Sequence, residues 1–360
     1  MLNLQTFIRE NENWRELISG KPYCIRVTEK NNLVCFKYSQ IDSDFHNPIV
    51  RECRGIILEK DTWNVVCYPF KKFFNFGESY ADEIDWASAR VLEKVDGSLV
   101  KVYFYDGEWR VGTNGTIDAN DAELSSPPYE TFMELFDMAA DICKLDFNRL
   151  DTNCTYIFEL RSPYNKVVVP YDDIRIVHIG TRDNRTCEEV EVDIGIEKPK
   201  QYMLSSLDDC IAMAATFDFT QEGFVIVDKN YHRVKVKSED YIRVHRLANN
   251  GSLTRERAVD LVRMNEIEEF LNYCPQYTSY IRDTQHRLAM FRNDILFNVN
   301  MALIEKMDCE TRKDFAAVAK TFPYPSIWFK VYDSTYFDID KWIAELSTPK
   351  LTQYLEKIGA

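Results

Sequence analysis

The residues with the clearest chemical potential form the segment Glu93-Lys94-Val95-Asp96-Gly97-Ser98. A lysine amine is a nucleophile once it is unprotonated, and a carboxylate two residues later can bind a cation. A surface turn is the simpler interpretation of Lys-x-Asp-Gly, because three fixed residues occur by chance in roughly a few per cent of chains of this size. The segment is therefore evidence of an active site only if other residues of the chain support it.

Further charged residues that could bind a phosphate group follow along the chain. Glu159 ends a strand-like apolar segment, and Glu222 precedes another. Lys235 and Lys237 are two residues apart, so on a strand both side chains point to one face. Such lysines repel each other. On a solvated edge strand water screens this repulsion, whereas in a binding site a bound polyphosphate would remove it. Both interpretations of this lysine pair stay open.

Together these residues suit attack by the Lys94 amine on a phosphate group. The neighbouring cations Arg54, Lys235 and Lys237 favour an unprotonated amine, and they would stabilise the charge that grows on an α-phosphate. Three carboxylates suit ribose hydroxyls or a Mg²⁺ ion held mainly through water, namely Asp96, Glu159 and Glu222.

The segments that must position these residues are mostly strands up to about residue 245. Turn signals and apolar runs predict strands at 23–27, 33–38, 55–58, 65–68, 100–105, 109–112, 155–160, 167–170, 174–179, 190–194, 223–227 and 233–237. Helical spacing predicts helices at 1–20, 82–91, 129–145 and 207–217. We therefore expect an α+β domain of antiparallel sheets with flanking helices over residues 1–245.

The composition changes after Gly251, because no glycine occurs again until Gly359. Apolar residues recur at helical spacing in segments 254–272, 280–306, 311–321 and 339–357. Pro323 and Pro325 separate the last two of these segments. We expect an all-helical C-terminal domain over residues 246–360.

The composition of the 360 residues is that of a soluble globular protein, with a net charge of −14. A chain this acidic cannot be basic over its whole surface, so any nucleic-acid binding must be focused in one cleft. It has no apolar run of ~18 residues for a membrane span and no signal-peptide pattern. Its ten cysteines are scattered without CxxC pairs and do not cluster with histidines. We expect a cytoplasmic monomer without zinc or membrane contact, in the host cytoplasm if the source is viral.

The order Lys-x-Asp-Gly, strand Glu, Glu-Gly and Lys-x-Lys resembles that of the lysyl-nucleotidyl transferases, which include DNA ligases, mRNA capping enzymes and RNA ligases. Residues 20–246 are similar to the RNA ligase 1 family of T-even bacteriophages through five segments: Arg51-Glu52-Cys53-Arg54-Gly55-Ile56, Lys72-Phe73-Phe74-Asn75-Phe76-Gly77-Glu78, Asp96-Gly97-Ser98-Leu99, Gln221-Glu222-Gly223-Phe224-Val225 and Lys235-Val236-Lys237-Ser238-Glu239-Asp240-Tyr241. The resemblance implies an ATP-dependent ligase that joins RNA 5′-phosphate and 3′-hydroxyl ends, with Mg²⁺ or Mn²⁺. The implied substrate is single-stranded RNA or a tRNA cleaved in its anticodon loop.

The resemblance also implies a role for each matched residue. Lys94 is the nucleophile that becomes lysyl-AMP, and Lys235 and Lys237 grip the α-phosphate. Arg54 and Lys72 contact the ATP phosphates or the RNA. The remaining nucleotide contacts are Phe74, Glu93, Gly97, Glu159, Gly223 and Val225, and the metal ligands are Asp96 and Glu222. Of these, Glu159 bonds the ribose, Gly97 lets backbone approach the nucleotide, and Phe74 is equally well explained as a core aromatic.

Two positions depart from related families. Ser98 stands where capping enzymes and most DNA ligases carry arginine, which favours an RNA ligase. Asn114 stands where the RNA ligase 1 family usually has a basic residue, and Arg110 is a candidate to supply that positive charge instead. A DNA ligase or a capping guanylyltransferase is the alternative, although both usually append an OB-fold, whose short strands and turns a glycine-poor helical tail does not match. A non-catalytic RNA-binding relative is the other alternative.

Overall fold

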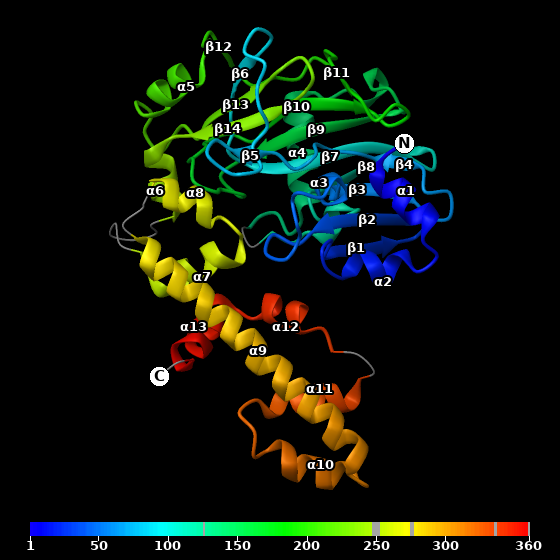
Figure 1. Ribbon diagram of the computed structural model, residues 1–360. Helices are drawn as coiled ribbons and strands as arrows, with labels where there is room; N and C mark the ends of the chain where they lie inside the picture. The colour runs from blue at the N-terminus through cyan, green and yellow to red at the C-terminus, as the bar shows by residue number, and fades with distance from the viewer. Residues whose placement is uncertain (125–126, 247–252, 274–276, 335–336, 359–360) are drawn as a thin grey trace. The chain divides into compact units, whose positions relative to one another are not determined.

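The computed structural model describes residues 1–124, 127–246, 253–273, 277–334 and 337–358 (Figure 1). The chain divides into two compact units, Met1–His245 and Arg246–Ala360. The first combines mainly antiparallel sheets with helices, and the second is helical wherever it is described as regular structure. The α+β fold class with a helical C-terminal region is confirmed.

The N-terminal sheet has the order β1-β2-β3-β4, and all its neighbours are antiparallel. Its strands are β1 (Ile25–Lys30), β2 (Leu33–Tyr38), β3 (Arg54–Glu59) and β4 (Val65–Cys67). Helices α1 (Asn3–Glu10), α2 (Trp14–Ser19) and α3 (Pro48–Glu52) contribute to the same hydrophobic core as one face of the sheet. The single helix expected over 1–20 is thus two helices, which separate at the polar residues 11–13.

Two five-stranded sheets complete the first unit, with the orders β11-β10-β9-β7-β8 and β12-β6-β13-β14-β5. The strands of the first are β7 (Ser98–Tyr105), β8 (Glu108–Thr113), β9 (Cys154–Arg161), β10 (Arg175–Asp183) and β11 (Glu189–Val190). Those of the second are β5 (Phe74–Asn75), β6 (Arg90–Glu93), β12 (Gln201–Tyr202), β13 (Gly223–Val227) and β14 (Arg233–Lys237). Helix α4 (Phe132–Cys143) packs against the first sheet and α5 (Leu207–Ala214) against the second. Two short 3₁₀ turns lie at Ala119–Asp121 and Phe147–Arg149.

The Lys-x-Asp-Gly segment is the crossover between these two sheets. Strand β6 ends at Glu93 in one sheet, and β7 begins at Ser98 in the other. Lys94 therefore lies where the two sheets meet, with rigid hydrogen-bonded strands on both sides. A residue in this place has little conformational freedom, which suits a side chain that must act with fixed geometry.

Two sequence-based expectations near this segment are wrong. Residues 82–89 form no helix, because Ser88 and the backbone of Ala87 bond Asp85 locally, and such bonds compete with helix formation. Residues 167–170 form a loop instead of a strand. The expected strand at 190–194 is reduced to β11.

The helical unit contains helices α7 (Arg255–Arg263), α8 (Ile267–Tyr273), α9 (Thr278–Asp308), α10 (Arg312–Ala319), α11 (Pro325–Asp333), α12 (Ile339–Glu345) and α13 (Thr348–Lys357), and α6 (Glu239–Arg246) leads into it. Its core packs α9 against α10–α13 around Phe291, Phe315 and Trp328. Helix α11 was not predicted, because Pro325 by itself suggests a break in a helix. At the first turn of a helix a proline is tolerated, because its missing N–H has no partner there anyway.

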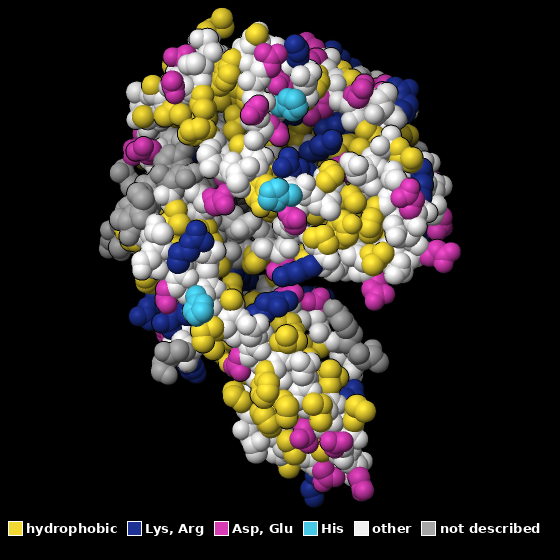
Figure 2. All heavy atoms as spheres, in the orientation of Figure 1, with side chains coloured by type: hydrophobic (Ala, Val, Ile, Leu, Met, Phe, Trp, Pro, Cys, Tyr) yellow, Lys and Arg dark blue, Asp and Glu magenta, His cyan; other side chains and the backbone are white. Residues whose placement is uncertain are grey.

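Helix α9 also carries hydrophobic side chains on its exposed side, including Phe297, Ile304 and Met307. Figure 2 shows hydrophobic side chains on the visible face of this unit, with acidic and basic groups between them. Among the described residues, no helix combines the length and the apolar character that a membrane crossing requires.

Candidate active site

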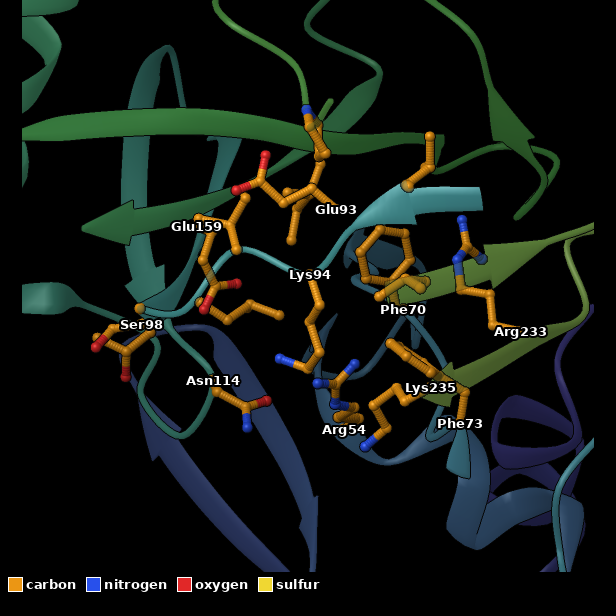
Figure 3. A pocket seen from close by; sticks show the side chains of 18 of the residues that line it. Arg54, Phe70, Phe73, Glu93, Lys94, Ser98, Asn114, Glu159, Arg233 and Lys235 are labelled. Carbon is orange, nitrogen blue, oxygen red and sulfur yellow. The ribbon is translucent and has the colours of Figure 1, made fainter. Parts of the chain in front are cut away.

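A cavity of about 540 Å³ lies in the first unit, and side chains from all three sheets line it. Figure 3 shows Arg54 from β3, Glu159 from β9 and Lys235 from β14 around Lys94. Eight of the sequence-predicted site residues line this cavity: Arg54, Glu93, Lys94, Gly97, Glu159, Val225, Lys235 and Lys237. The structure therefore brings together residues that are up to 183 positions apart in the chain (237 − 54).

The Lys94 side chain is held by a carboxylate. Its Nζ lies 2.7 Å from Oε2 of Glu222, and Nζ of Lys237 lies 3.4 Å from the other oxygen, Oε1. Glu222 is only 4% exposed, so water weakens these contacts little. The Lys94, Arg54 and Lys235 side chains point toward one another (Figure 3).

This ion pair was not expected from the sequence, which suggested only cations around the amine. An adjacent carboxylate stabilises the charged ammonium, whereas adjacent cations destabilise it. Glu222 is also the group in contact with the proton that the ammonium must lose before it can attack. The Glu222 carboxylate thus holds the Lys94 side chain in place.

The backbone of Lys94 is fixed by Gly223, whose carbonyl accepts a hydrogen bond of 2.9 Å from the Lys94 N–H. Gly223 has a φ of +136°, and a Cβ at this position would lie 2.1 Å from the carbonyl oxygen of Val236. Only glycine fits this close approach of β13 and β14. The predicted importance of Gly223 thus has a backbone explanation, since Gly223 does not line the cavity.

Gly223→Ala is expected to lower the free energy of unfolding by roughly 2–4 kcal/mol, because the added methyl group forces β13 and β14 apart. Urea denaturation measures the change. Gly20→Ala is the matched control, since a Cβ there meets no atom closer than 3.7 Å. Equal stability of the two variants would contradict the packing explanation.

Asp96 is held in place by three hydrogen bonds. Its Oδ2 accepts hydrogen bonds from the N–H groups of Val168 (2.9 Å) and Val169 (2.8 Å), and its Oδ1 accepts one of 2.8 Å from the hydroxyl of Tyr241. The residue is 3% exposed. Asp96 ties the Lys94 crossover to the 167–170 loop and to α6, and its role as a metal ligand stays a prediction. Sequence reasoning quoted Tyr241 in a matched segment but gave it no role.

The carboxylates present do not form a metal cage. Within the described residues no three His, Cys, Asp or Glu side chains are grouped closely enough to hold an ion. Both oxygens of Glu222 already contact lysines, and the Glu159 carboxylate is close enough to act on the same site. This set fits an ion held mainly by water and phosphate oxygens.

Glu159 lies on β9 with its carboxylate in the cavity, between Lys94 and Ser98 in Figure 3. Burial raises the pKa of Glu159 to about 7, although Lys94 and Arg54 act in the opposite direction. No protein donor bonds this carboxylate among the residues described. A hydrogen-bond acceptor is therefore available to a hydroxyl group of a ligand.

Glu159→Gln is expected to stabilise the ligand-free protein at pH 8 by roughly 2 kcal/mol, with no gain near pH 4.5. The folded pKa of about 7 lies above the ordinary value of 4.5, so the stability associated with this carboxyl is present below pH 4.5 and is lost as the pH rises through 7. Thermal unfolding at both pH values measures the difference. Glu83→Gln, at an exposed carboxylate, is the control. A gain at pH 8 that persists unchanged at low pH would contradict the shifted pKa.

Phe73 holds two of the cations in place. The Arg54 guanidinium and the Lys235 ammonium each lie 5.2 Å from the centre of its ring, a distance typical of cation–π contacts. Nη1 of Arg54 is buried without a hydrogen-bond partner in the part of the chain described. A buried, unsatisfied guanidinium nitrogen beside a lysine is ready to bind an anion.

Phe74 and Lys72 lie outside the cavity lining. Phe74 is 2% exposed and packs on Phe45 and Tyr80, so the core interpretation of this residue is the one that the structure supports. The Lys72 ammonium lies 5.4 Å from the Phe74 ring centre. Successive side chains of an extended segment point in opposite directions, and for this reason Phe73 faces the cavity instead.

The comparison with known proteins decides the family. A family model described as RNA ligase matches residues 52–241, which include all the cations and carboxylates named above. The chain belongs to the RNA ligase family. The predicted resemblance to RNA ligases is thereby confirmed.

Individual relatives are more distant. A protein of Autographa californica nuclear polyhedrosis virus, named as a bifunctional polynucleotide kinase/RNA ligase, is 26% identical over 355 residues, which are 93% of this chain and 50% of that protein. The chain thus spans half the length of this relative. The RNA ligase of Rhodothermus phage RM378 is 27% identical over 320 residues, 69% of this chain and 71% of the phage protein. A solved archaeal ATP-dependent RNA ligase aligns with a TM-score of 0.47 and 12% identity, over 81% of this chain and 83% of the archaeal one.

In this RNA ligase family member, the packing of the backbone itself requires a glycine at position 97. A Cβ at Gly97 would lie 2.4 Å from the carbonyl oxygen of Leu160 and 3.1 Å from Cγ of Glu159. Glycine thus lets the Lys94 crossover pass directly over β9. The close approach is between protein segments and does not require a nucleotide.

Arg110, the candidate to supply the charge that Asn114 lacks, makes its contacts elsewhere. This guanidinium bonds Glu108 at 2.8 Å and lies over the Tyr105 ring, outside the cavity lining. Asn114 does line the cavity, and its Oδ1 is buried without a hydrogen-bond partner among the described residues. Several cavity residues had no predicted role, among them Lys37, Phe70, Ile179 and Arg233.

Proposed function

We propose that this protein is an ATP-dependent RNA ligase that joins RNA 5′-phosphate and 3′-hydroxyl ends through lysyl-AMP and RNA-adenylate intermediates. The observation that carries the proposal is one lysine amine at the junction of two sheets, facing a cavity that Arg54, Lys235 and Lys237 line, in a member of the RNA ligase family. The chemistry of nucleotidyl transfer needs such a nucleophile and such fixed cations.

In the first step the Lys94 amine attacks the α-phosphate of ATP, a nitrogen–phosphorus bond forms, and the bond to pyrophosphate breaks. Glu222 contacts the amine and is the acceptor placed to take its proton. Lys235, Lys237 and Arg54 stabilise the charge that grows on the α-phosphate and on the departing pyrophosphate. Mg²⁺ or Mn²⁺, bound mainly through water and phosphate oxygens, would neutralise part of the triphosphate charge.

The same cavity holds the nucleoside. Val225, Ile179 and Phe70 offer apolar surface for the adenine ring, and the Glu159 carboxylate is an acceptor for a ribose hydroxyl. Glu93 lines the same space and adds a polar contact. Adenylate bound in this way stays near Lys94 while the RNA end enters.

In the second step the RNA 5′-phosphate displaces Lys94 from the adenylate, which produces a 5′-5′ linked RNA-adenylate. In the third step the RNA 3′-hydroxyl attacks the 5′-phosphate, a phosphodiester bond forms, and AMP leaves. We assign this chemistry to residues 1–245 and the choice of RNA to the helical residues 246–360. The natural substrate in this proposal is single-stranded RNA or a tRNA broken in its anticodon loop, bound by one copy of the chain.

A ligation panel with the full chain tests the proposal. Single-stranded RNA, cleaved tRNA, a nicked RNA duplex and a nicked DNA duplex, each with a 5′-phosphate, are incubated with ATP or GTP and Mg²⁺. Sealing of RNA with ATP is the expected result. Sealing of DNA alone would indicate a DNA ligase, labelling of the protein by GTP alone a capping enzyme, and RNA binding without any nucleotide transfer a non-catalytic relative.

A further inference from the structure

Three cations form a row across the N-terminal sheet. Lys37 on β2 is paired in register with Arg26 on β1 and with Arg54 on β3. Directly opposite residues of neighbouring strands project from the same face of a sheet, and like charges in such positions repel each other. A row of three cations on one face is therefore unfavourable unless an anion occupies it.

Lys37 belongs to the same cavity as Lys94 and Arg54. Its Nζ lies against the 114–115 turn, where a Cβ on Gly115 would come within 2.9 Å of it. Gly115 thus leaves the space that the Lys37 amine fills. Asn114, the neighbour of this glycine, is the uncharged residue that stands in place of the expected basic one.

No carboxylate balances Lys37. Within the described part of the chain it makes no ion pair or side-chain hydrogen bond, and the charged side chains that act on it most strongly are the cations Arg26 and Lys101. Burial, with these cations, lowers the pKa of Lys37, while Tyr38 acts in the opposite direction. Lys101 is fully buried and donates to the Gly55 carbonyl, so it supplies a second fixed positive charge and no acceptor.

A half-buried ammonium without a counterion is costly, and proteins accept this cost where a ligand supplies the counterion. The occupant must be an anion that reaches Lys94, because the amines of Lys37 and Lys94 and the Arg54 guanidinium line one cavity. Arg26 is exposed and extends the row out of the cavity toward solvent. A chain of phosphates matches a row of this kind better than a single small anion does.

We propose that Lys37 is a substrate-binding residue of the ligase that contacts a phosphate group and supplies, from β2, the positive charge that Asn114 does not. This proposal rests on the proposed function. The phosphate belongs to the ATP triphosphate during adenylylation of Lys94 or to the RNA 5′-end during sealing. Arg54 shares the same phosphate, and Arg26 contacts the next one along an RNA strand.

Two partial reactions separate these sources of phosphate. Lysyl-AMP formation is followed in single turnover with subsaturating α-labelled ATP, and phosphodiester formation is followed with RNA that is already adenylylated. Lys37→Gln is expected to slow one or both reactions roughly 10- to 100-fold, because a charge-assisted hydrogen bond is lost. Loss in the first reaction assigns the ATP triphosphate, and loss in the second assigns the RNA end. Arg26→Gln is expected to slow only the second reaction.

Three further variants control the result. Lys37→Arg keeps the charge and is expected to keep most of the activity. Lys60→Ala removes an exposed lysine that pairs with Glu29, and it should change both reactions less than about twofold. The relocated pair Lys37→Asn with Asn114→Lys is expected to recover most of what Lys37→Asn loses, because the charge returns to the same space from the other side.

Stability gives an independent readout. Lys37→Gln is expected to raise the melting temperature of the ligand-free protein, since it removes a half-buried charge without a counterion. If the first reaction is the one slowed, the substitution is also expected to weaken stabilisation by inorganic pyrophosphate relative to the wild type. Wild-type rates in both partial reactions for Lys37→Gln would overturn this proposal alone. A wild-type protein that forms no lysyl-AMP would instead overturn the proposed function.

Discussion

Lys94→Ala and Lys94→Arg are both expected to abolish covalent labelling of the protein by α-labelled ATP, a loss of more than about 1000-fold. Alanine has no nucleophile. Arginine keeps the positive charge beside Glu222, but its guanidinium stays protonated at every accessible pH and does not attack phosphorus. The measurement is retention of label on denatured protein after incubation with ATP and Mg²⁺.

The same variants carry their own control. RNA that is already adenylylated does not need lysyl-AMP, so Lys94→Arg is expected to seal it at a measurable rate. Its melting temperature should stay near that of the wild type, because the crossover is held by backbone bonds such as that from Lys94 to Gly223. Label that survives in Lys94→Ala would show that another residue is the nucleophile.

Glu222→Gln is expected to slow lysyl-AMP formation by roughly 100- to 1000-fold. The amide has nearly the same shape but cannot accept the Lys94 proton or balance Lys94 and Lys237, which lie 2.7 and 3.4 Å from its two oxygens. If Glu222 acts as the proton acceptor, part of the loss should be recovered at higher pH, where the amine loses its proton to solvent. Single-turnover labelling across the pH range measures both effects.

Glu52→Gln is the matched control for this second substitution. Glu52 is 2% exposed, and its oxygens accept hydrogen bonds from the backbone of Asn3 and Leu4 at the start of α1, away from Lys94. It is expected to lower stability without a selective loss of labelling. Wild-type labelling by Glu222→Gln would show that the carboxylate only holds Lys94 in place.

The fold class and the central set of residues could be predicted from the sequence because they depend on local signals. Lys94, Glu159, Glu222 and the pair Lys235 and Lys237 stand in motifs with fixed spacing. Strand alternation and turn residues then indicate that such motifs lie on sheet ends. Long-range pairing supplies only the final geometry for these residues.

The residues that were missed or misjudged depend on contacts between distant segments. Lys37 lies in an ordinary apolar strand, and only the register with Arg54 and the turn at Gly115 brings it to the cavity. The spacing of Asp96 suggests a metal ligand, and it does not reveal that the carboxylate accepts hydrogen bonds from the backbone N–H groups of Val168 and Val169. A single sequence does not show which side chains will be buried or which distant backbone groups will bond them.

Backbone hydrogen bonding also explains the errors in secondary structure. The 82–91 segment has helical spacing, yet its last two residues, Arg90 and Val91, are drawn into sheet pairing as the start of β6, next to β13. Pairing with a formed sheet outweighs a weak helix preference, since each residue gains a ladder bond and a packed neighbour. That pairing fixes Glu93, the residue before the nucleophile, on a rigid strand.

The most direct test of the account is the mass of the intact protein after incubation with ATP and Mg²⁺, followed by peptide mapping. We predict an increase by a single adenylate group, located on Lys94, which disappears when pyrophosphate is added because the first step reverses. Absence of any adduct, or an adduct on a different residue while Lys94 stays unmodified, would contradict the account.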